Sequence, residues 1–176
     1  MRDSGETELQ SEDIYRIKKE AIDELRMHFV FNILNAIRYL IKNDQDKAYD
    51  VVYDLAQFMR GNIQSVAVGG IISLEEELSF VHSYMKLEQV QKGRLAVNWD
   101  VENVEGYVVA CGSIYTALEK LLKEDFYIHK HVRTFSIQKD SEEEIVRISI
   151  AETGKEVVIP TYRRSTGGDN ENDIGR

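Results

Sequence analysis

His28 is the side chain in this sequence best suited to nucleophilic chemistry. An imidazole ring is nucleophilic near neutral pH when one of its nitrogens is neutral and exposed. Asn32 follows one helical turn later, so its amide would lie on the same helix face and could hold the ring or a water molecule. A single histidine in an apolar helix is more often a packed core residue, and these residues alone leave both interpretations open.

The composition narrows the classes of partner and compartment. The chain has 176 residues, 43% of them apolar and 30% charged, which suits one soluble domain or two small ones. A formal net charge of −9 repels phosphate backbones, so we expect no nucleic-acid partner. Cys111 is the only cysteine, which excludes an internal disulfide and a cysteine-based zinc site and predicts a cytoplasmic location. No stretch reaches the roughly 18 apolar residues of a membrane helix, so we expect no membrane segment in this chain. The histidines show no metal-ligand spacing, so we also expect no metal site.

Two amphipathic helices are predicted to position His28. The first extends to about Ile41, and after a turn at Asn43-Asp44 the second extends to Gly61, which we predict ends it. Apolar residues recur at helical spacing in both, at Ile22, Leu25, Phe29, Ile33, Ala36 and Leu40 and then at Ala48, Val51, Val52, Leu55, Phe58 and Met59. These faces are too wide for one hairpin to bury. We therefore predict a disordered lead-in over residues 1–12 and a hairpin over 13–66 that pairs with a second copy as a four-helix bundle.

The second half of the chain mixes helices and strands. Ser73 and Glu76 form a capping box that starts a third helix, and Lys92-Gly93 ends it. A strand then follows from Arg94, a helix lies within 106–123, and two strands are expected around 132–138 and 145–151. The predicted class is thus α+β, with a mixed domain over residues 71–162 and a flexible polar tail over 163–176.

Three segments together resemble the LytS-type histidine kinases. Residues 28–35 read HFVFNILN where the family has HFLFNxLN, and residues 55–60 read LAQFMR where it has LSxLLR. Residues 72–94, ISLEEELSFVHSYMKLEQVQKGR, match the family's L-x-x-E-L, then Y-x-x-x-E, then R. The three segments keep the family's order and spacing, and the resemblance covers about residues 20–100. The family's proline before the histidine is Met27 here.

This resemblance implies a fold, an activity and partners. It implies a dimerisation and histidine-phosphotransfer hairpin followed by an ATPase-like α/β sandwich. It makes His28 the phosphoacceptor and a response-regulator receiver domain the partner. The chain would then be the cytoplasmic core of a sensor kinase, including the case of a membrane-bound sensor whose membrane part lies outside this sequence.

The resemblance weakens in the ATP-binding half. The family's V-E-N-A-x-K-H-G helix, whose asparagine helps to hold magnesium, corresponds to residues 118–125, where Glu119 is kept but Lys120 replaces the asparagine. The family's D-x-G-x-G corresponds to residues 152–156, where Glu152 replaces the aspartate, Gly154 is kept and a glutamate replaces the second glycine. ATP and magnesium would therefore be held by a degenerate site that includes Glu119, Lys120, Glu152 and Gly154. The alternative is that this stretch is only a packing helix and two strands.

Three functional hypotheses follow. The first is a kinase core that autophosphorylates His28 and passes the phosphoryl group to an aspartate of a response regulator. The second is a histidine phosphotransferase that does not use ATP. The third is a non-catalytic pseudokinase that binds partners and in which His28 is a core residue.

Overall fold

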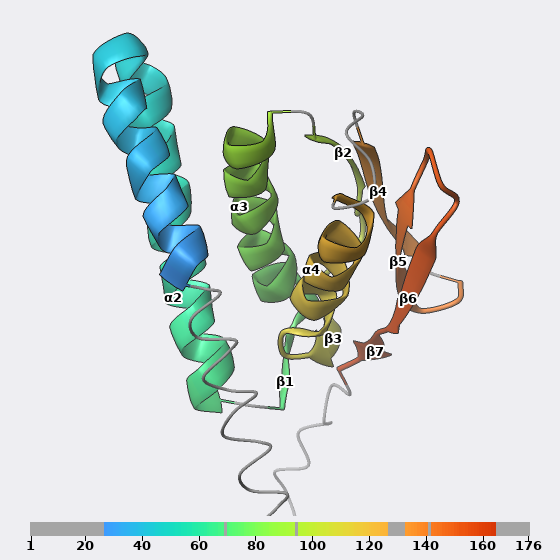
Figure 1. The fold of residues 1–176 in the computed structure, drawn as a ribbon. Helices are drawn as coiled ribbons and strands as arrows, with labels where there is room; N and C mark the ends of the chain where they lie inside the picture. Colours follow the sequence, from blue (N-terminus) through green and yellow to red (C-terminus); the bar gives the residue numbers. More distant parts are fainter. Residues whose placement is uncertain (1–26, 69, 94, 127–132, 141, 165–176) are drawn as a thin grey trace, which may run out of the picture. The chain divides into compact units, whose positions relative to one another are not determined.

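The computed structural model describes residues 27–68, 70–93, 95–126, 133–140 and 142–164 (Figure 1). The chain divides into two compact units, residues 1–55 and 56–176. Each unit is described by itself below.

The first unit is a helical hairpin with a very short turn. A helix over residues 27–43 is followed by α2 (Gln45–Val68), whose residues up to Leu55 belong to this unit. Asp44 separates the two helices, and its Oδ1 accepts a hydrogen bond from the backbone N–H of Lys47 at 3.1 Å. That bond satisfies one of the N–H groups that the start of a helix leaves without an intrahelical partner. The turn predicted at Asn43-Asp44 is therefore confirmed.

The hairpin buries only a narrow stripe of each helix. The buried apolar residues are Ile33 and Ile37 on the first helix and Ala48 and Val51 on α2. Large apolar side chains on the neighbouring face of the first helix remain exposed. The contacts within one hairpin therefore bury only part of its apolar surface.

The second unit places α3 (Leu74–Lys92) and α4 (Ser113–Phe126) on one face of a four-stranded sheet (Figure 1). The strand order of this sheet is β2-β4-β5-β6, with β2 parallel to β4 and the other pairs antiparallel. A second, antiparallel sheet has the order β1-β3-β7. The strands are β1 (Ile71–Ser73), β2 (Leu95–Asp100), β3 (Tyr107–Ala110), β4 (Arg133–Asp140), β5 (Ile145–Ile150), β6 (Glu156–Pro160) and β7 (Tyr162–Arg163).

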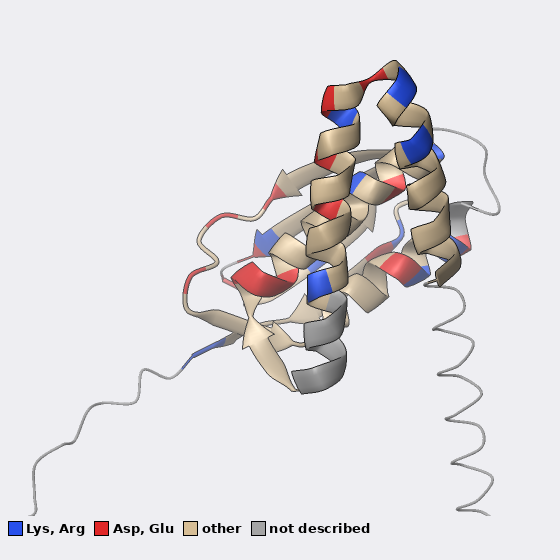
Figure 2. Ribbon diagram, turned by 90° about the vertical axis from the view of Figure 1, so that its left-hand side faces the viewer, with Lys and Arg blue, Asp and Glu red and all other residues tan. Residues whose placement is uncertain are grey.

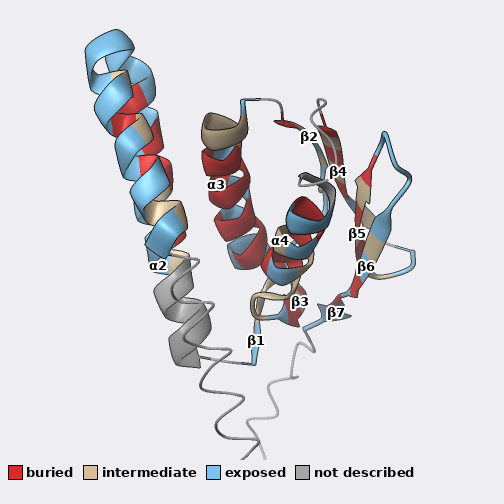
Figure 3. Ribbon diagram, viewed as in Figure 1, coloured by how far each residue is buried: buried red, intermediate tan, exposed pale blue. Residues whose placement is uncertain are grey.

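The core of this unit lies between the helices and the larger sheet. Alternate residues of β4 and β5 are buried, as the period of two in a half-buried strand requires (Figure 3). They meet the buried face of α4, which carries Ile114, Leu118, Leu121 and Leu122. The opposite face of the sheet carries polar side chains such as Ser136, Arg147 and Ser149. The predicted α+β class is confirmed for the described residues.

The ends of α3 agree with the prediction. The Ser73 Oγ accepts a hydrogen bond from the backbone N–H of Glu76 at 3.2 Å, as an N-cap does. Gly93 has φ 60°, the left-handed conformation that glycine adopts without strain, and its N–H bonds to the carbonyl of Gln89 at 2.9 Å. Both ends are fixed by chemistry within a few residues.

Other predictions were wrong. Gly61 does not end the second helix, because α2 continues to Val68. The helix predicted within 106–123 is present as α4, but it starts only at Ser113, because the segment begins with strand β3. The strands β1, β6 and β7 were not predicted.

The domain boundaries at 13–66 and 71–162 remain predictions. The predicted lead-in over 1–12 lies outside the described residues. So does the predicted tail from residue 165 onward, whereas Arg163 lies in β7.

Gly61 has a packing reason to be glycine. A Cβ at this position would lie 2.3 Å from Cδ2 of Phe80, which is closer than real Cβ contacts. The Phe80 ring is itself buried and stacks on Phe58, with ring centroids 5.4 Å apart. The ring therefore has little room to move, and α2 approaches α3 closely at this point.

We expect Gly61→Ala to lower the free energy of unfolding. The clash should cost about 1–3 kcal/mol, against a gain of about 1 kcal/mol in helix propensity. Chemical denaturation followed by circular dichroism would measure the difference. In a Phe80→Ala background the same substitution should stabilise the protein by about 1 kcal/mol, and an equal loss in both backgrounds would contradict this account.

Candidate functional site

His28 lies near the start of the described part of the first helix, with its side chain exposed. Its Nδ1 lies 3.2 Å from Nδ2 of Asn32, the residue one turn later. A histidine of the core would be buried, whereas this ring is open to solvent within the described structure. The sequence analysis paired these two residues, and the structure brings them into contact.

The contact with Asn32 controls which ring nitrogen is nucleophilic. If the amide NH2 donates to Nδ1, the neutral ring carries its proton on Nε2, and Nε2 has no lone pair for attack. If the amide is turned so that Oδ1 accepts from Nδ1–H, the lone pair is on Nε2. The two amide orientations differ only by exchange of O and N, which have nearly the same shape. Nucleophilic attack by Nε2 therefore requires the second orientation.

Glu119 and Lys120 lie on α4 and make contacts within that helix. The Glu119 Oε1 accepts a hydrogen bond from the Tyr115 hydroxyl at 3.3 Å and pairs with Nζ of Lys123 at 3.2 Å. The Lys120 Nζ lies 3.9 Å from Oε1 of Glu124, and its side chain is 72% exposed. Neither residue contacts the other two predicted cofactor residues.

Glu152 and Gly154 lie on the turn between β5 and β6. Both carboxylate oxygens of Glu152 accept from the backbone N–H of Thr134 in β4, at 2.9 and 3.0 Å. Partial desolvation raises the pKa of Glu152, but the Thr134 bonds outweigh it, so that pKa lies below its usual range. Gly154 has φ 66°, and no atom lies within 4 Å of the place where a Cβ would be. A glycine is therefore favoured here by the backbone conformation of the turn and not by close packing.

One ion pair brings the two predicted cofactor segments together. The Lys155 Nζ, next to Gly154, lies 3.8 Å from Oε2 of Glu124. Because Glu124 also pairs with Lys120, its carboxylate joins the last turns of α4 to the β5–β6 turn. Exposed ion pairs at such distances contribute little to stability. These pairs therefore show that the two segments lie close together, and they add little to the free energy of unfolding.

Sequence reasoning missed the residue that fixes the start of α4. Glu77, in the L-x-x-E-L pattern, is 1% exposed. Its Oε2 accepts from the N–H of Gly112 at 2.9 Å, and its Oε1 accepts from the N–H groups of Ile114 and Tyr115 at 3.1 and 3.2 Å. A buried carboxylate thus satisfies donors at a helix N-terminus, where negative charge is favoured. Its burial by partners more than thirty residues away could not be read from the local sequence.

Comparison with known proteins identifies relatives of this chain. The family model described as histidine kinase matches residues 22–95. The sensor protein LytS of Staphylococcus saprophyticus is 31% identical over 153 residues, which cover 85% of this chain and 26% of the relative. The chain belongs to the LytS-type histidine kinases.

Two further relatives extend the comparison. The sensor protein LytS of Enterococcus faecalis is 29% identical over 163 residues, 91% of this chain and 27% of the relative. The sensor histidine kinase/phosphatase LytS of Staphylococcus aureus (strain MRSA252) is 29% identical over 155 residues, 86% of this chain and 26% of the relative. This LytS-type chain spans about a quarter of the length of these relatives.

In the described ranges, no helix combines the length and the apolar character needed to cross a bilayer. In the same ranges, no group of three or more His, Cys, Asp and Glu side chains is placed to hold a metal ion.

The residues at the family's magnesium position do not fit that ion. The sequence pattern predicts Lys120 at the position where LytS-type kinases have asparagine, and an ammonium group has no lone pair for a metal. The adenine position fits better, because the ionised Glu152 is an acceptor that can receive a hydrogen bond from an amino group. The residue predicted at the adenine position therefore suits its group, whereas the residue predicted at the magnesium position does not.

We expect Glu77→Gln to destabilise the protein most in acid. Burial raises the pKa of Glu77 above the usual 4.5, and the three backbone hydrogen bonds lower it by less. A raised folded-state pKa gives stability that is fully present below the unfolded pKa and is lost as the pH rises through the folded value. Glutamine would place an NH2 against one N–H donor, at a cost of about 1–3 kcal/mol.

Denaturation at several pH values would measure this effect. The gap in unfolding free energy between wild type and Glu77→Gln should be widest at and below pH 4.5 and should shrink as the pH rises above it. Glu75→Gln, at an exposed position on the same helix, serves as the control and should show only a small gap. A gap of constant size for Glu77→Gln would show that its pKa is not raised.

Proposed function

We propose that this chain is the phosphotransfer core of a two-component sensor histidine kinase and acts in the cytoplasm. His28 accepts a phosphoryl group on Nε2 and passes it to an aspartate of a response-regulator receiver domain. The observation that carries the proposal is the exposed ring of His28, whose Nδ1 is held by Asn32 on a helix of a LytS-type chain. This arrangement argues against the hypothesis that His28 is only a core residue.

The proposed chemistry requires one lone pair and one orientation. The Nε2 lone pair attacks phosphorus, an N–P bond forms, and the bond from phosphorus to the donor's oxygen breaks, with the electron pair leaving on that oxygen. An aspartate oxygen of the receiver then attacks phosphorus, and the N–P bond breaks with its electrons returning to the ring. Asn32 supports both steps if its Oδ1 accepts from Nδ1–H, because this holds the ring in the nucleophilic tautomer.

The first form of the proposal has ATP as the phosphoryl donor. Membership of the LytS-type family supports it, and so does the ionised Glu152, which suits an adenine amino group. In this form the second unit is the ATPase-like α/β sandwich, and its helices on one face of a mixed sheet support that reading (Figure 1). The domain boundaries predicted at 13–66 and 71–162 belong to the same proposal.

The second form is a histidine phosphotransferase that does not use ATP. Lys120 favours it, because its ammonium group removes a metal ligand and pairs with Glu124. His28 would then receive its phosphoryl group from a phosphorylated receiver domain. Both forms assign the same role to His28 and differ only in the donor.

A homodimer is the third element of the proposal. Met27, Phe31, Leu34 and Ile41 are exposed and, with Arg38 between the last two, follow a spacing of 4, 3, 4 and 3 residues. That spacing forms the seam of a coiled coil. In the described part of this helix, no Lys, Arg, Asp or Glu occurs before Arg38 (Figure 2). A second hairpin covering this seam would complete a four-helix bundle.

We expect radiolabelled phosphate to be incorporated at His28. The chain is incubated with labelled Mg-ATP or, separately, with a labelled phosphorylated receiver domain. His28→Ala should abolish the label, whereas His82→Ala, which removes an exposed histidine elsewhere in the chain, should retain it. The label should be labile in acid and stable in base, as a phosphoramidate is.

The two donors separate the two forms. Label from ATP supports the kinase form, and Lys120→Asn, which restores an amide at the magnesium position, should then increase the initial rate. Label only from the receiver domain supports the phosphotransferase form. No label from either donor, or label that survives in His28→Ala, would contradict the role of His28.

We expect the mass in solution to be twice that of the 20.3 kDa chain. Phe31→Glu should convert the dimer to monomer, because it places a charge in the apolar seam. Asn35→Glu adds the same charge at an exposed position outside the seam and should leave the dimer intact. Sedimentation equilibrium measures both variants, and a monomeric wild-type chain at micromolar concentration would refute the dimer.

A further inference from the structure

A hollow of about 440 Å³ lies between α3 and the end of β2, within the second unit. Its apolar lining comes from Leu78 on α3, Trp99 on β2, and Val101 and Val104 on the following loop. Ser79, His82 and Glu75 complete it from α3. None of these residues belongs to the phosphoacceptor or cofactor positions described above.

The helix face that lines the hollow is distinct from the face that builds the core. Positions 75, 78, 79 and 82 are spaced by three or four residues, so they share one side of α3. Phe80 and Tyr84 point to the other side, where they join the aromatic cluster with Phe58. The hollow is therefore an outward-facing feature of a helix already fixed by its core face.

The strand beside the hollow has an edge without a strand partner. Within the described strands, β2 pairs only with β4 and forms one edge of the four-stranded sheet. Such an edge presents backbone N–H and C=O groups that an extended segment can pair with. Side chains of that segment could then enter the hollow next to Trp99. This combination of an edge strand and an apolar hollow suits a peptide more than a compact small molecule.

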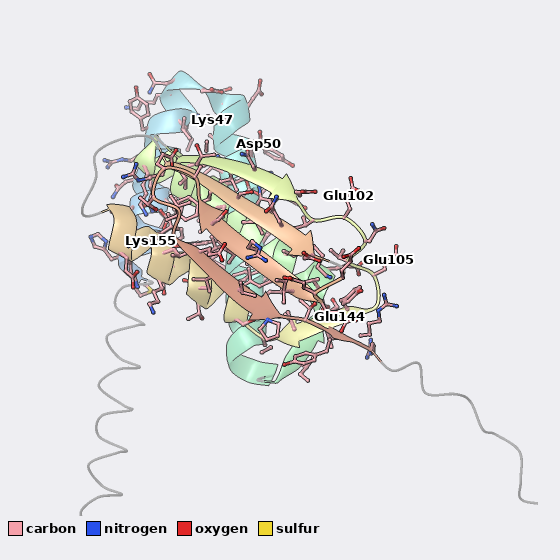
Figure 4. All side chains as sticks on the ribbon, turned by 90° about the vertical axis from the view of Figure 1, so that its right-hand side faces the viewer. Lys47, Asp50, Glu102, Glu105, Glu144 and Lys155 are labelled. Carbon is pink, nitrogen blue, oxygen red and sulfur yellow. The ribbon has the colours of Figure 1, made fainter. Side chains whose placement is uncertain are left out.

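The charges around the hollow are acidic. Glu75 lines this hollow and also the adjoining one of about 840 Å³. Glu102 and Glu105 are exposed on the loop that follows β2 (Figure 4). No Lys or Arg is among the residues that line the apolar hollow. The adjoining hollow is also lined by Arg163 and Arg164, of which Arg163 is paired with Glu144 at 3.4 Å, so part of the charge of Arg163 is already compensated.

We propose that this hollow docks an extended basic segment of a partner protein. An aromatic or branched apolar side chain of the segment packs against Trp99, and flanking Lys or Arg side chains meet Glu75, Glu102 and Glu105. The site lies at the end of the sheet opposite Lys155 and the β5–β6 turn (Figure 4). The docking proposal therefore uses none of the residues proposed to bind a nucleotide or to accept the phosphoryl group.

Trp99 makes the proposal directly measurable. It is the only tryptophan of the chain, so the tryptophan emission, excited apart from the tyrosines, reports on this hollow alone. Its ring lies against His82, with centroids 5.0 Å apart and an interplanar angle of 71°. An apolar side chain entering the hollow should shift the Trp99 emission to shorter wavelength, because it displaces water from the ring.

The test is a fluorescence titration of the full chain with two end-blocked peptides. One is Lys-Phe-Lys-Leu-Lys-Lys, and the other is the same peptide with every lysine replaced by glutamate. We expect a saturable shift with the basic peptide only. Its affinity should fall at least about threefold as ionic strength rises from about 0.05 to 0.3 M, because the rim charges are exposed.

Three variants assign the binding to the hollow. Ser79→Arg fills it and adds like charge, and Glu75→Gln removes a rim carboxylate; both positions are exposed, so the fold should persist. Each should weaken binding, Ser79→Arg by about tenfold or more. Glu142→Gln makes the same change as Glu75→Gln at an exposed turn outside the hollow and should bind as wild type.

Three results would overturn the proposal. The first is the absence of a saturable shift with the basic peptide. The second is equal binding of both peptides, or binding that Ser79→Arg leaves unchanged. The third is a Trp99 shift that depends on protein concentration without peptide and disappears in Ser79→Arg, because a second copy of the chain would then occupy the hollow.

Discussion

The buried carboxylate of Glu77 is the interaction on which the second unit depends. The N–H groups of Gly112, Ile114 and Tyr115 point into a region where Glu77 is almost fully buried, so protein atoms must satisfy them. A donor left unsatisfied there would cost about 1–3 kcal/mol. One side chain of α3 therefore decides where α4 begins. Next to it, the N–H of Cys111 bonds to the carbonyl of Gly70 at 2.8 Å, which connects the same loop to the strand before α3.

Helix α4, whose first turn is bound by Glu77, also carries two residues of the candidate nucleotide site. The Tyr115 N–H bonds to Glu77, while its ring lies 5.2 Å from that of Phe80 and 4.9 Å from that of Tyr84. The cap and the aromatic cluster thus hold the same turn of α4. Further along the same helix, Oε2 of Glu124 lies 3.8 Å from Nζ of Lys155 on the β5–β6 turn. The contact of Glu77 with the first turn of α4 therefore also fixes the positions of Glu119 and Lys120 on that helix.

The sequence predicted those features that depend on near neighbours. The start of α3 at Ser73 and its end at Gly93 follow from caps within four residues, and the contact of His28 with Asn32 follows from helix spacing. Features set by distant partners were missed. Strand β3 exists because Tyr107 to Ala110 pair with β1 and β7, and Gly61 is glycine because of Phe80. Likewise, the pattern L-x-x-E-L gives no sign that its glutamate is bonded to residues 112–115.

This division between local and distant contacts explains why the two halves of the chain depart from the LytS-type pattern to different degrees. The orientation of His28 requires one helix and one amide at i+4, so substitutions elsewhere in the chain leave that pair intact. Magnesium binding by α4 requires an acceptor at one position, and a single lysine removes it, although Lys120 is exposed and paired with Glu124 at no evident cost to the fold. Because Glu77 and the aromatic cluster hold the first turn of α4 through protein contacts, a substitution at the exposed position of Lys120 leaves the packing of this helix unchanged. The helix proposed to carry the phosphoacceptor and the second unit can therefore both keep their structures while the residue at the proposed magnesium position changes.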